Sequence, residues 1–259
     1  MNHLAAVAAG FSKRQKLSIL LLALYWPTLF VLAHIPIPQI VRQANVSDKS
    51  LHFLSYMILV FLLWSAMKPD RKVDWRKAAA WLVLLVVVWY GVCDEWLQRY
   101  VVGRTTDIND FAADLAGAVT SLIVLSIFSF WPTSLIVTGI TIFSITNSTG
   151  ADLSKLVPVI NTLFQFLSYA LFTALWVRYT RDFLRTAAPK LRWLATVLAL
   201  PSGLLLVVRL GSVIAGRNFN KWDVIISAAG IATVIAGLSV AGLFRQRSVR
   251  TRGLSPADT

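Results

Sequence analysis

Long apolar runs alternate with short polar segments along the whole chain. Residues 81–93 have no polar stripe, whereas a helix on the surface of a soluble protein carries a polar residue every three or four positions. About 20 apolar residues are needed to cross the roughly 30 Å hydrocarbon core of a bilayer. The pattern therefore predicts an all-α fold, a polytopic transmembrane helical bundle. About eight spans are expected, at 17–33, 51–67, 78–93, 111–130, 133–146, 158–177, 193–211 and 224–244.

The fifth of these spans is short and rich in threonine. Only Trp131 and Pro132 separate it from the fourth span. A proline at this place predicts a tight turn between the two helices.

The composition agrees with a membrane protein. Hydrophobic residues make up 57% of the chain and charged residues 14%, whereas about 25% of the residues in a soluble domain are charged. The net charge of +13 comes from short basic clusters between the apolar runs, not from one basic face, which argues against a nucleic-acid partner. The lone cysteine, Cys93, excludes an intramolecular disulfide.

The basic clusters predict how the spans are oriented. With the N-terminus inside, 17 of the 25 lysine and arginine residues fall in cytoplasmic segments and 8 on the other side. Because cytoplasmic loops are enriched in basic residues, we expect both termini in the cytoplasm and a multi-pass protein of the bacterial cytoplasmic (inner) membrane. The first apolar run is interpreted as an uncleaved span, so residues 1–16 form a cytoplasmic N-terminus and residues 245–259 a basic cytoplasmic tail.

An internal repeat emerges when the chain is aligned with itself so that position 48 meets position 161. In this repeat alignment, residues 48–120 match 161–233 without a gap, and polar positions agree as well as apolar ones. This predicts two parallel four-helix units, at 17–130 and 131–244, related by an axis along the membrane normal. The matches that carry the prediction are His52-Phe-Leu-Ser-Tyr56 with Gln165-Phe-Leu-Ser-Tyr169, Gly103-Arg104-x-x-Asp107-x-x-Asp110 with Gly216-Arg217-x-x-Asn220-x-x-Asp223, and Gly117 with Gly230.

The two units differ in their polar residues. In the repeat alignment, His52 meets Gln165, and the polar residues Asp94, Glu95 and Gln98 meet Val207, Val208 and Gly211. Because the second unit has lost charge where the first keeps it, we expect one functional site, in the first unit. The second unit is interpreted as a degenerate packing partner.

The polar residues of the first unit gather at the outer ends of three spans. Asp94 and Gln98 are four residues apart and share a helix face, and Asp107 or Asn109 can cap the fourth span. Charged residues that border apolar spans are expensive and tend to be functional. The ligand-binding candidates are His52, Asp94, Glu95, Gln98, Arg104, Asp107 and Asp110. Residues that recur in both units or run down one face of the fourth span are expected to be structural: Asp114, Gly117, Arg217, Asp223 and Gly230.

These residues resemble the motif of the VanZ-like family of bacterial membrane proteins over about residues 17–130. The elements are Asp48-x-x-x-His52-Phe-x-x-Tyr56, Asp94-Glu95-x-x-Gln98 and Gly103-Arg104-x-x-Asp107-x-x-Asp110-x-x-x-Asp114-x-x-Gly117. The resemblance implies a cell-envelope protein of the kind associated with resistance to the glycopeptide teicoplanin. The resemblance indicates a family and implies no particular chemical reaction.

Three functions of different class are open. The favoured one is a non-enzymatic protein that binds membrane lipids or a lipid-linked cell-wall precursor at the outer leaflet, or that affects a glycopeptide there. The second is a membrane enzyme acting on a lipid phosphate or glycosyl group, with acid–base or metal-ligand chemistry from Asp48 with His52 and Asp94 with Glu95. The third is a transporter. The sequence identifies no cofactor and leaves both catalysis and metal dependence open.

Overall fold

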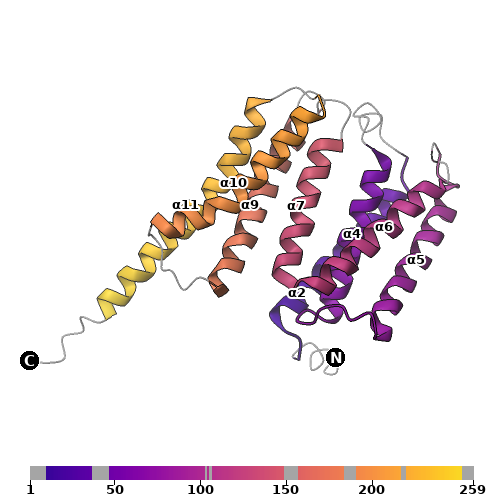
Figure 1. Ribbon diagram of the computed structural model, residues 1–259, viewed down its shortest axis with the longest axis horizontal. Helices are drawn as coiled ribbons and strands as arrows, with labels where there is room; N and C mark the ends of the chain where they lie inside the picture. The colour runs from indigo at the N-terminus through magenta and orange to yellow at the C-terminus, as the bar shows by residue number, and fades with distance from the viewer. Residues whose placement is uncertain are drawn as a thin grey trace, which may run out of the picture. The chain divides into compact units, whose positions relative to one another are not determined.

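The computed structural model describes residues 10–36, 47–102, 104, 107–148, 157–183, 191–216 and 220–252. Over these residues all the regular structure is helical, which confirms the expected helical bundle (Figure 1). The helices are α2 (Lys13–Ala33), α4 (Asp48–Met67), α5 (Ala78–Gln98), α6 (Ile108–Ile127), α7 (Phe130–Ser148), α9 (Pro158–Phe183), α10 (Leu191–Ile214) and α11 (Lys221–Arg252).

Seven of the helices in the described residues are long and apolar enough to cross a membrane, so the chain is a multi-pass membrane protein. The helix outside this set is α7, the predicted fifth span, which contains several threonine and serine residues. It begins at Phe130, so Trp131 and Pro132 lie inside its first turn instead of forming the predicted turn between helices. A proline is tolerated there because the first N–H groups of a helix have no intrahelical acceptor.

Each described helix extends beyond its predicted span at one end or both, and three of these extensions bring polar residues of the predicted site into helices. Helix α4 begins at Asp48, α6 begins at Ile108, and α5 continues to Gln98 instead of ending near residue 93. Side-chain caps explain two of these starts: Ser47 accepts a hydrogen bond from the backbone N–H of Ser50, and Asp107 accepts one from Asn109. The polar residues that end α5 are therefore helical and buried, although they interrupt the hydrophobic pattern.

The chain forms two compact units, Met1–Asp152 and Leu153–Thr259. Helix α7 belongs to the first unit, whereas the sequence pattern placed the boundary at residue 130. The reason is packing: the rings of Phe61 and Phe130 lie 5.5 Å apart, and Val137 of α7 is part of the buried core of the N-terminal unit.

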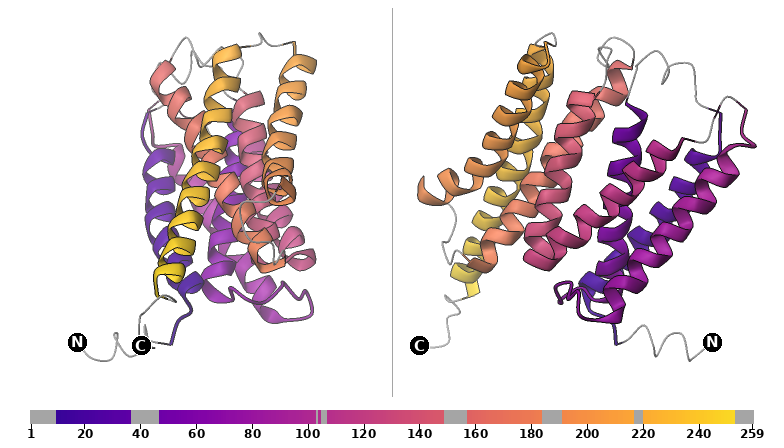
Figure 2. Two further views of the ribbon diagram at one scale, coloured as in Figure 1. Left: turned by 90° about the vertical axis from the view of Figure 1, so that its left-hand side faces the viewer. Right: turned by 45° about the vertical axis from the view of Figure 1, so that its right-hand side comes forward.

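Helix α4 is the centre of the N-terminal unit. It packs most extensively against α6 and also contacts α2, α5 and α7 (Figures 1 and 2). Helices α4 and α6 cross so closely that a Cβ atom on Gly117 would collide with the carbonyl oxygen of Phe53. Gly117 thus lets two backbones touch.

The two ends of the N-terminal unit differ in charge. At one end, the Arg14 guanidinium bonds the Asp70 carboxylate at 2.9 Å and the Lys72 ammonium donates to the carbonyl oxygen of Ile127 at 2.6 Å. The basic cluster at the start of α2 and the one that follows α4 therefore share this end. The opposite end carries the predicted site, and the positive-inside rule would place it outside the cell.

The C-terminal unit contains α9, α10 and α11, and α9 packs most extensively against α11. Helices α5 and α6 begin at Ala78 and Ile108, and α10 and α11 begin at the positions that the repeat alignment pairs with them, Leu191 and Lys221. The close crossing recurs in the same alignment, because a Cβ atom on Gly230 would collide with the carbonyl oxygen of Phe166. The duplication inferred from the sequence stays a prediction, and the matching helix starts and glycine contacts agree with it.

Candidate functional site

A polar contact of the N-terminal unit joins α4 to α6. His52 Nδ1 lies 2.9 Å from Asp114 Oδ1, and both side chains are largely buried. Asp114 is one helical turn from Gly117, so the close backbone crossing brings α4 and α6 together beside this pair. Asp114 was expected to be structural, and the structure places it in the same cluster as the ligand-binding candidates.

The last turns of α5 add three buried polar residues. Gln98 Nε2 donates to Asp94 Oδ2 at 2.7 Å, as expected for two residues four apart on one helix face. Glu95 Oε2 accepts a 3.3 Å hydrogen bond from the backbone N–H of Asp107. The end of α5 is thereby tied to the start of α6.

Asp107 caps α6, as predicted. Its Oδ1 accepts hydrogen bonds from the backbone N–H and the side-chain amide of Asn109, at 2.9 and 2.7 Å. Its Oδ2 accepts a hydrogen bond from Lys49 Nζ at 2.9 Å. These donors stabilise the ionised carboxylate and lower the pKa of Asp107 below its usual value.

The structure adds two basic residues, Lys49 and His34, that the sequence motif did not include. Lys49 Nζ lies 3.4 Å from Asp110 Oδ1 in addition to its bond with Asp107. His34, in the residue position that follows α2, places Nδ1 3.8 Å from Asp94 Oδ1. Lys49 and Asp110 are far apart in the sequence, so their contact cannot be predicted from a local sequence pattern. The approach of His34 to Asp94 depends on how α2 packs against α5.

Among the contacts of the described residues, Arg104 forms no ion pair with Glu95 or Asp110. Its Nη2 donates instead to the backbone carbonyl oxygen of Leu32 at 3.2 Å, which fixes the loop after α5 to the end of α2. Its buried Nε has no hydrogen-bond partner within the described part of the chain. Arg104 can therefore direct one donor toward a bound group.

Several buried acceptors of the site are unsatisfied. Within the described ranges, Asp94 Oδ1, Glu95 Oε1 and Asp114 Oδ2 have no hydrogen-bond partner. Their residues are 4%, 8% and 1% exposed, so bulk water does not compensate for the missing donors. More than nine in ten buried polar groups in proteins have a partner. These three oxygens can accept hydrogen bonds from a bound ligand or hold a cation.

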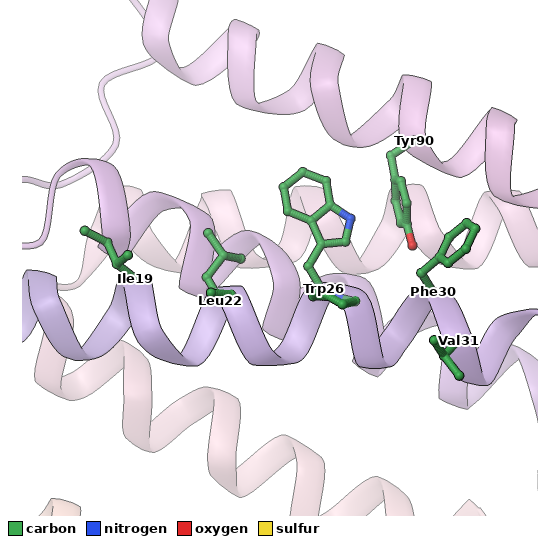
Figure 3. A pocket seen from close by; sticks show the side chains of 8 residues that line it. Ile19, Leu22, Trp26, Phe30, Val31 and Tyr90 are labelled. Carbon is green, nitrogen blue, oxygen red and sulfur yellow. The ribbon is translucent and has the colours of Figure 1, made fainter. Parts of the chain in front are cut away.

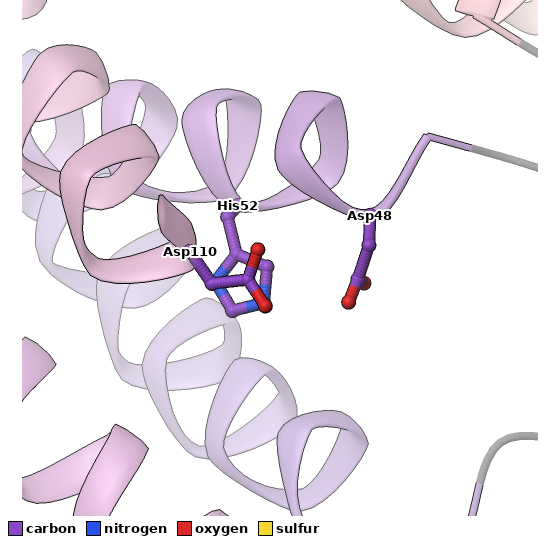
Figure 4. Close-up of side chains that lie close together, drawn as sticks. All are labelled: Asp48, His52 and Asp110. Atoms are coloured by element: carbon purple, nitrogen blue, oxygen red, sulfur yellow. The ribbon is translucent and has the colours of Figure 1, made fainter. Parts of the chain in front are cut away.

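Two sets of possible metal ligands share His52. One consists of His52, Glu95 and Asp114, and the other of Asp48, His52 and Asp110; within each set the ligand atoms lie within 4.8 Å of one another. Figure 4 shows Asp48 and His52 on α4 with the carboxylate of Asp110 beside the imidazole. Hence His52 is the residue through which any bound cation would be held.

An apolar groove lies between α2 and α5. It has a volume of about 530 Å³, and both Trp26 of α2 and Tyr90 of α5 line it (Figure 3). Their ring centroids are 5.5 Å apart, and the ring of Tyr90 is in turn 5.9 Å from that of Tyr56 in the core. The remaining lining residues are Ile19, Leu22, Ala23, Pro27, Phe30 and Val31.

The groove reaches toward the polar cluster. Tyr90 and Asp94 are one helical turn apart on the same face of α5, and Phe30 stacks on His34 with ring centroids 4.2 Å apart. The apolar groove and the buried carboxylates are therefore neighbours along both helices.

The predicted structural residues of the second half lie elsewhere. Asp223 Oδ1 accepts a 2.8 Å hydrogen bond from Asn161 Nδ2, and its other oxygen is 3.6 Å from Arg209 Nη1. Arg217 lies outside the described residues. The C-terminal unit thus holds its own polar pairs, with fewer acids than the N-terminal unit.

Comparison with known proteins identifies one relationship. A sequence model of the VanZ/LLP1 family matches residues 9–129. This segment contains α2, α4, α5 and α6 and all the predicted ligand-binding candidates. No curated protein and no solved structure matches the chain.

Proposed function

Because the N-terminal unit of this membrane protein belongs to the VanZ-like family, we propose that it binds a lipid or a lipid-linked cell-wall precursor at the outer leaflet. The head group occupies the polar cluster at the ends of α4, α5 and α6. The hydrocarbon chain lies in the groove between α2 and α5. A link to glycopeptide resistance follows if the bound lipid is the precursor that such drugs recognise.

The observation that carries this proposal is the adjacency of the groove and the cluster. An apolar groove of about 530 Å³ suits a hydrocarbon chain. Its wall residue Tyr90 lies one turn from the buried Asp94, so a single amphipathic molecule spans both regions. Arg104 supplies an unpaired Nε, and guanidinium groups are well suited to phosphate oxygens.

Tryptophan substitutions on neighbouring residues of α2 test the proposal. Ala23→Trp fills the groove, whereas Leu24→Trp places the same ring at a residue that does not line it. We expect native mass spectrometry of the detergent-purified protein to show a retained anionic lipid in the wild type and in Leu24→Trp. Retention should be several-fold lower in Ala23→Trp. Equal retention in all three proteins, or no retained lipid in the wild type, would overturn the proposal.

A second candidate function is hydrolysis or transfer at a lipid phosphate or glycosyl group. It is favoured by the His52–Asp114 pair, in which a carboxylate orients an imidazole that can transfer a proton. The test is release of phosphate or sugar from lipid substrates in vesicles that contain the purified protein. A product that forms with the wild type and not with His52→Gln would support catalysis, and turnover by neither protein would leave the binding function alone.

A further inference from the structure

We propose that His52, Glu95 and Asp114 bind one divalent cation of the zinc or manganese type. The three residues come from α4, α5 and α6, and all three are largely buried. Their ligand atoms lie within 4.8 Å of one another, so small side-chain rotations bring them to the bond lengths of about 2 Å that these ions require. The site joins three helices at one depth.

The unsatisfied oxygens point to a cation. Asp114 is 1% exposed and Glu95 8% exposed, and in the described residues Asp114 Oδ2 and Glu95 Oε1 have no hydrogen-bond partner. Each carboxylate has one bonded oxygen and one buried oxygen without a partner, and an unsatisfied buried acceptor is unfavourable. A divalent ion compensates two carboxylates at once and supplies both of the missing partners.

The donor set selects the class of metal. It contains one imidazole nitrogen and two carboxylate oxygens. Calcium takes six to eight oxygen ligands, and magnesium is bound mainly through carboxylates, phosphates and water. Imidazole with carboxylates suits zinc and manganese better. Three protein ligands also leave a coordination position open for an outside molecule.

The alternative set of ligands is weaker. Asp48 is exposed, and Asp110 already has the ammonium group of Lys49 at 3.4 Å. A cation bound there would compete with a lysine that neutralises the same carboxylate. We therefore assign the ion to Glu95 and Asp114 and not to Asp48 and Asp110.

In the C-terminal unit, the helices that the repeat alignment pairs with α4, α5 and α6 lack the charged residues of this site. In the repeat alignment, Gln165 and Ser227 stand where His52 and Asp114 do, and Ser227 Oγ donates to Gln165 Oε1 at 3.1 Å. Gln165 Oε1 also has Arg209 Nη2 at 3.4 Å. Val208 stands where Glu95 does. A neutral pair thus joins α9 to α11, so packing of this kind does not require the buried acids of the N-terminal unit.

The cation also explains how an acidic cluster can hold an anionic head group, a step that rests on the function proposed above. Asp94, Glu95 and Asp114 would repel a phosphate by themselves. A divalent ion at His52 offsets two of these negative charges, and its open coordination position accepts a phosphate oxygen. Arg104 then supplies the second contact.

The experiment measures metal in the purified full-length protein. The wild type is stripped with a chelator, dialysed against Mn²⁺ or Zn²⁺ and analysed by inductively coupled plasma mass spectrometry and by titration calorimetry. The principal variant is the double substitution His52→Gln with Asp114→Ser, which copies the Gln165–Ser227 pair. Glu95→Gln is a second variant in case the double variant fails to fold, and Asp48→Asn is the matched control.

We expect one ion per chain in the wild type and in Asp48→Asn, and affinity lower by about tenfold or more in Glu95→Gln and in the double variant. No uptake by the wild type, unchanged affinity in Glu95→Gln, or loss of the ion in Asp48→Asn would overturn the assignment. Lipid retention is measured on the same samples. Lipid retained by a wild type that binds no metal would refute the cation site and leave the lipid-binding function standing.

Discussion

His52 and Asp114 are 62 residues apart in the sequence, yet His52 Nδ1 lies 2.9 Å from Asp114 Oδ1. The residues that the repeat alignment pairs with them, Gln165 and Ser227, are also hydrogen-bonded, at 3.1 Å. Both pairs join helices that cross at a glycine. The same position on two helix pairs is thus charged in one unit and neutral in the other, which allows charge and packing to be varied separately.

The first prediction concerns the stability of the charged pair. His52→Ala removes the partner of a buried carboxylate and should lower the free energy of unfolding by about 3 kcal/mol. The double substitution His52→Gln with Asp114→Ser leaves a neutral hydrogen-bonded pair and should cost only about 1 kcal/mol. Thermal unfolding in detergent, followed by tryptophan fluorescence, compares the two. A double variant as unstable as His52→Ala would contradict this account.

The second prediction concerns the glycine crossings. Gly117→Ala would push a methyl group into the carbonyl oxygen of Phe53 and force α4 and α6 apart, at a cost of about 2 kcal/mol. Gly230→Ala should behave in the same way. Gly203→Ala is the control, because a Cβ atom there has no neighbour within 4 Å and alanine favours a helix. Equal stabilities of Gly117→Ala and Gly203→Ala would show that the crossing is looser than described.

The third prediction concerns pH. The pKa of Asp107 is lowered in the folded protein by its bonds to Asn109 and Lys49, so the stabilisation exists above the ordinary carboxyl pKa of about 3.9. It is lost as the pH falls through the lowered folded value. Asp107→Ala should therefore be less stable than the wild type at neutral pH, and the gap should narrow below about pH 4.

Asp107→Asn is the control for this pH dependence. Asparagine caps a helix nearly as well as aspartate but does not ionise in this range. The stability difference between Asp107→Asn and Asp107→Ala should stay constant with pH. Melting temperatures measured across the acid range provide the comparison. A stability difference between wild type and Asp107→Ala that grows on acidification would contradict the prediction.

The fourth prediction concerns orientation. In a Cys93→Ser background, a cysteine at Val102 should react with a membrane-impermeant thiol reagent in intact cells, because Val102 is 82% exposed at the end that carries the site. A cysteine at Arg71, at the basic end, should react only after the cells are opened. Labelling of Arg71→Cys in intact cells would invert the proposed topology.

Much of the fold follows from the hydrophobic pattern. Each expected span corresponds to a helix, because the apolar runs are long and sharply bounded. Helix ends were less predictable: α5 continues to Gln98 since Asp94 and Gln98 bond each other on one face and remain buried. The pattern also could not assign α7, whose place depends on the contact between Phe61 and Phe130.

The candidate site was predictable where residues lie on one helix. The spacing placed Asp110, Asp114 and Gly117 on one buried face of α6, as found. Contacts between helices were not predictable. His34 approaches Asp94 only through the packing of α2 on α5, and Arg104 bonds a backbone carbonyl that leaves no trace in the sequence. The groove beside Tyr90 is formed by the packing of α2 against α5, and no sequence motif marks its lining residues.

The contact between Gly117 and the Phe53 carbonyl has a consequence for binding. Because backbone atoms set the separation of α4 and α6, the backbones that carry His52 and Asp114 are held close together, one turn or less from the crossing. A ligand that enters such a site finds the two groups already in place and loses little affinity to ordering them. Selectivity is then steep, since a rigid frame of this kind cannot widen for an ion or head group of the wrong size.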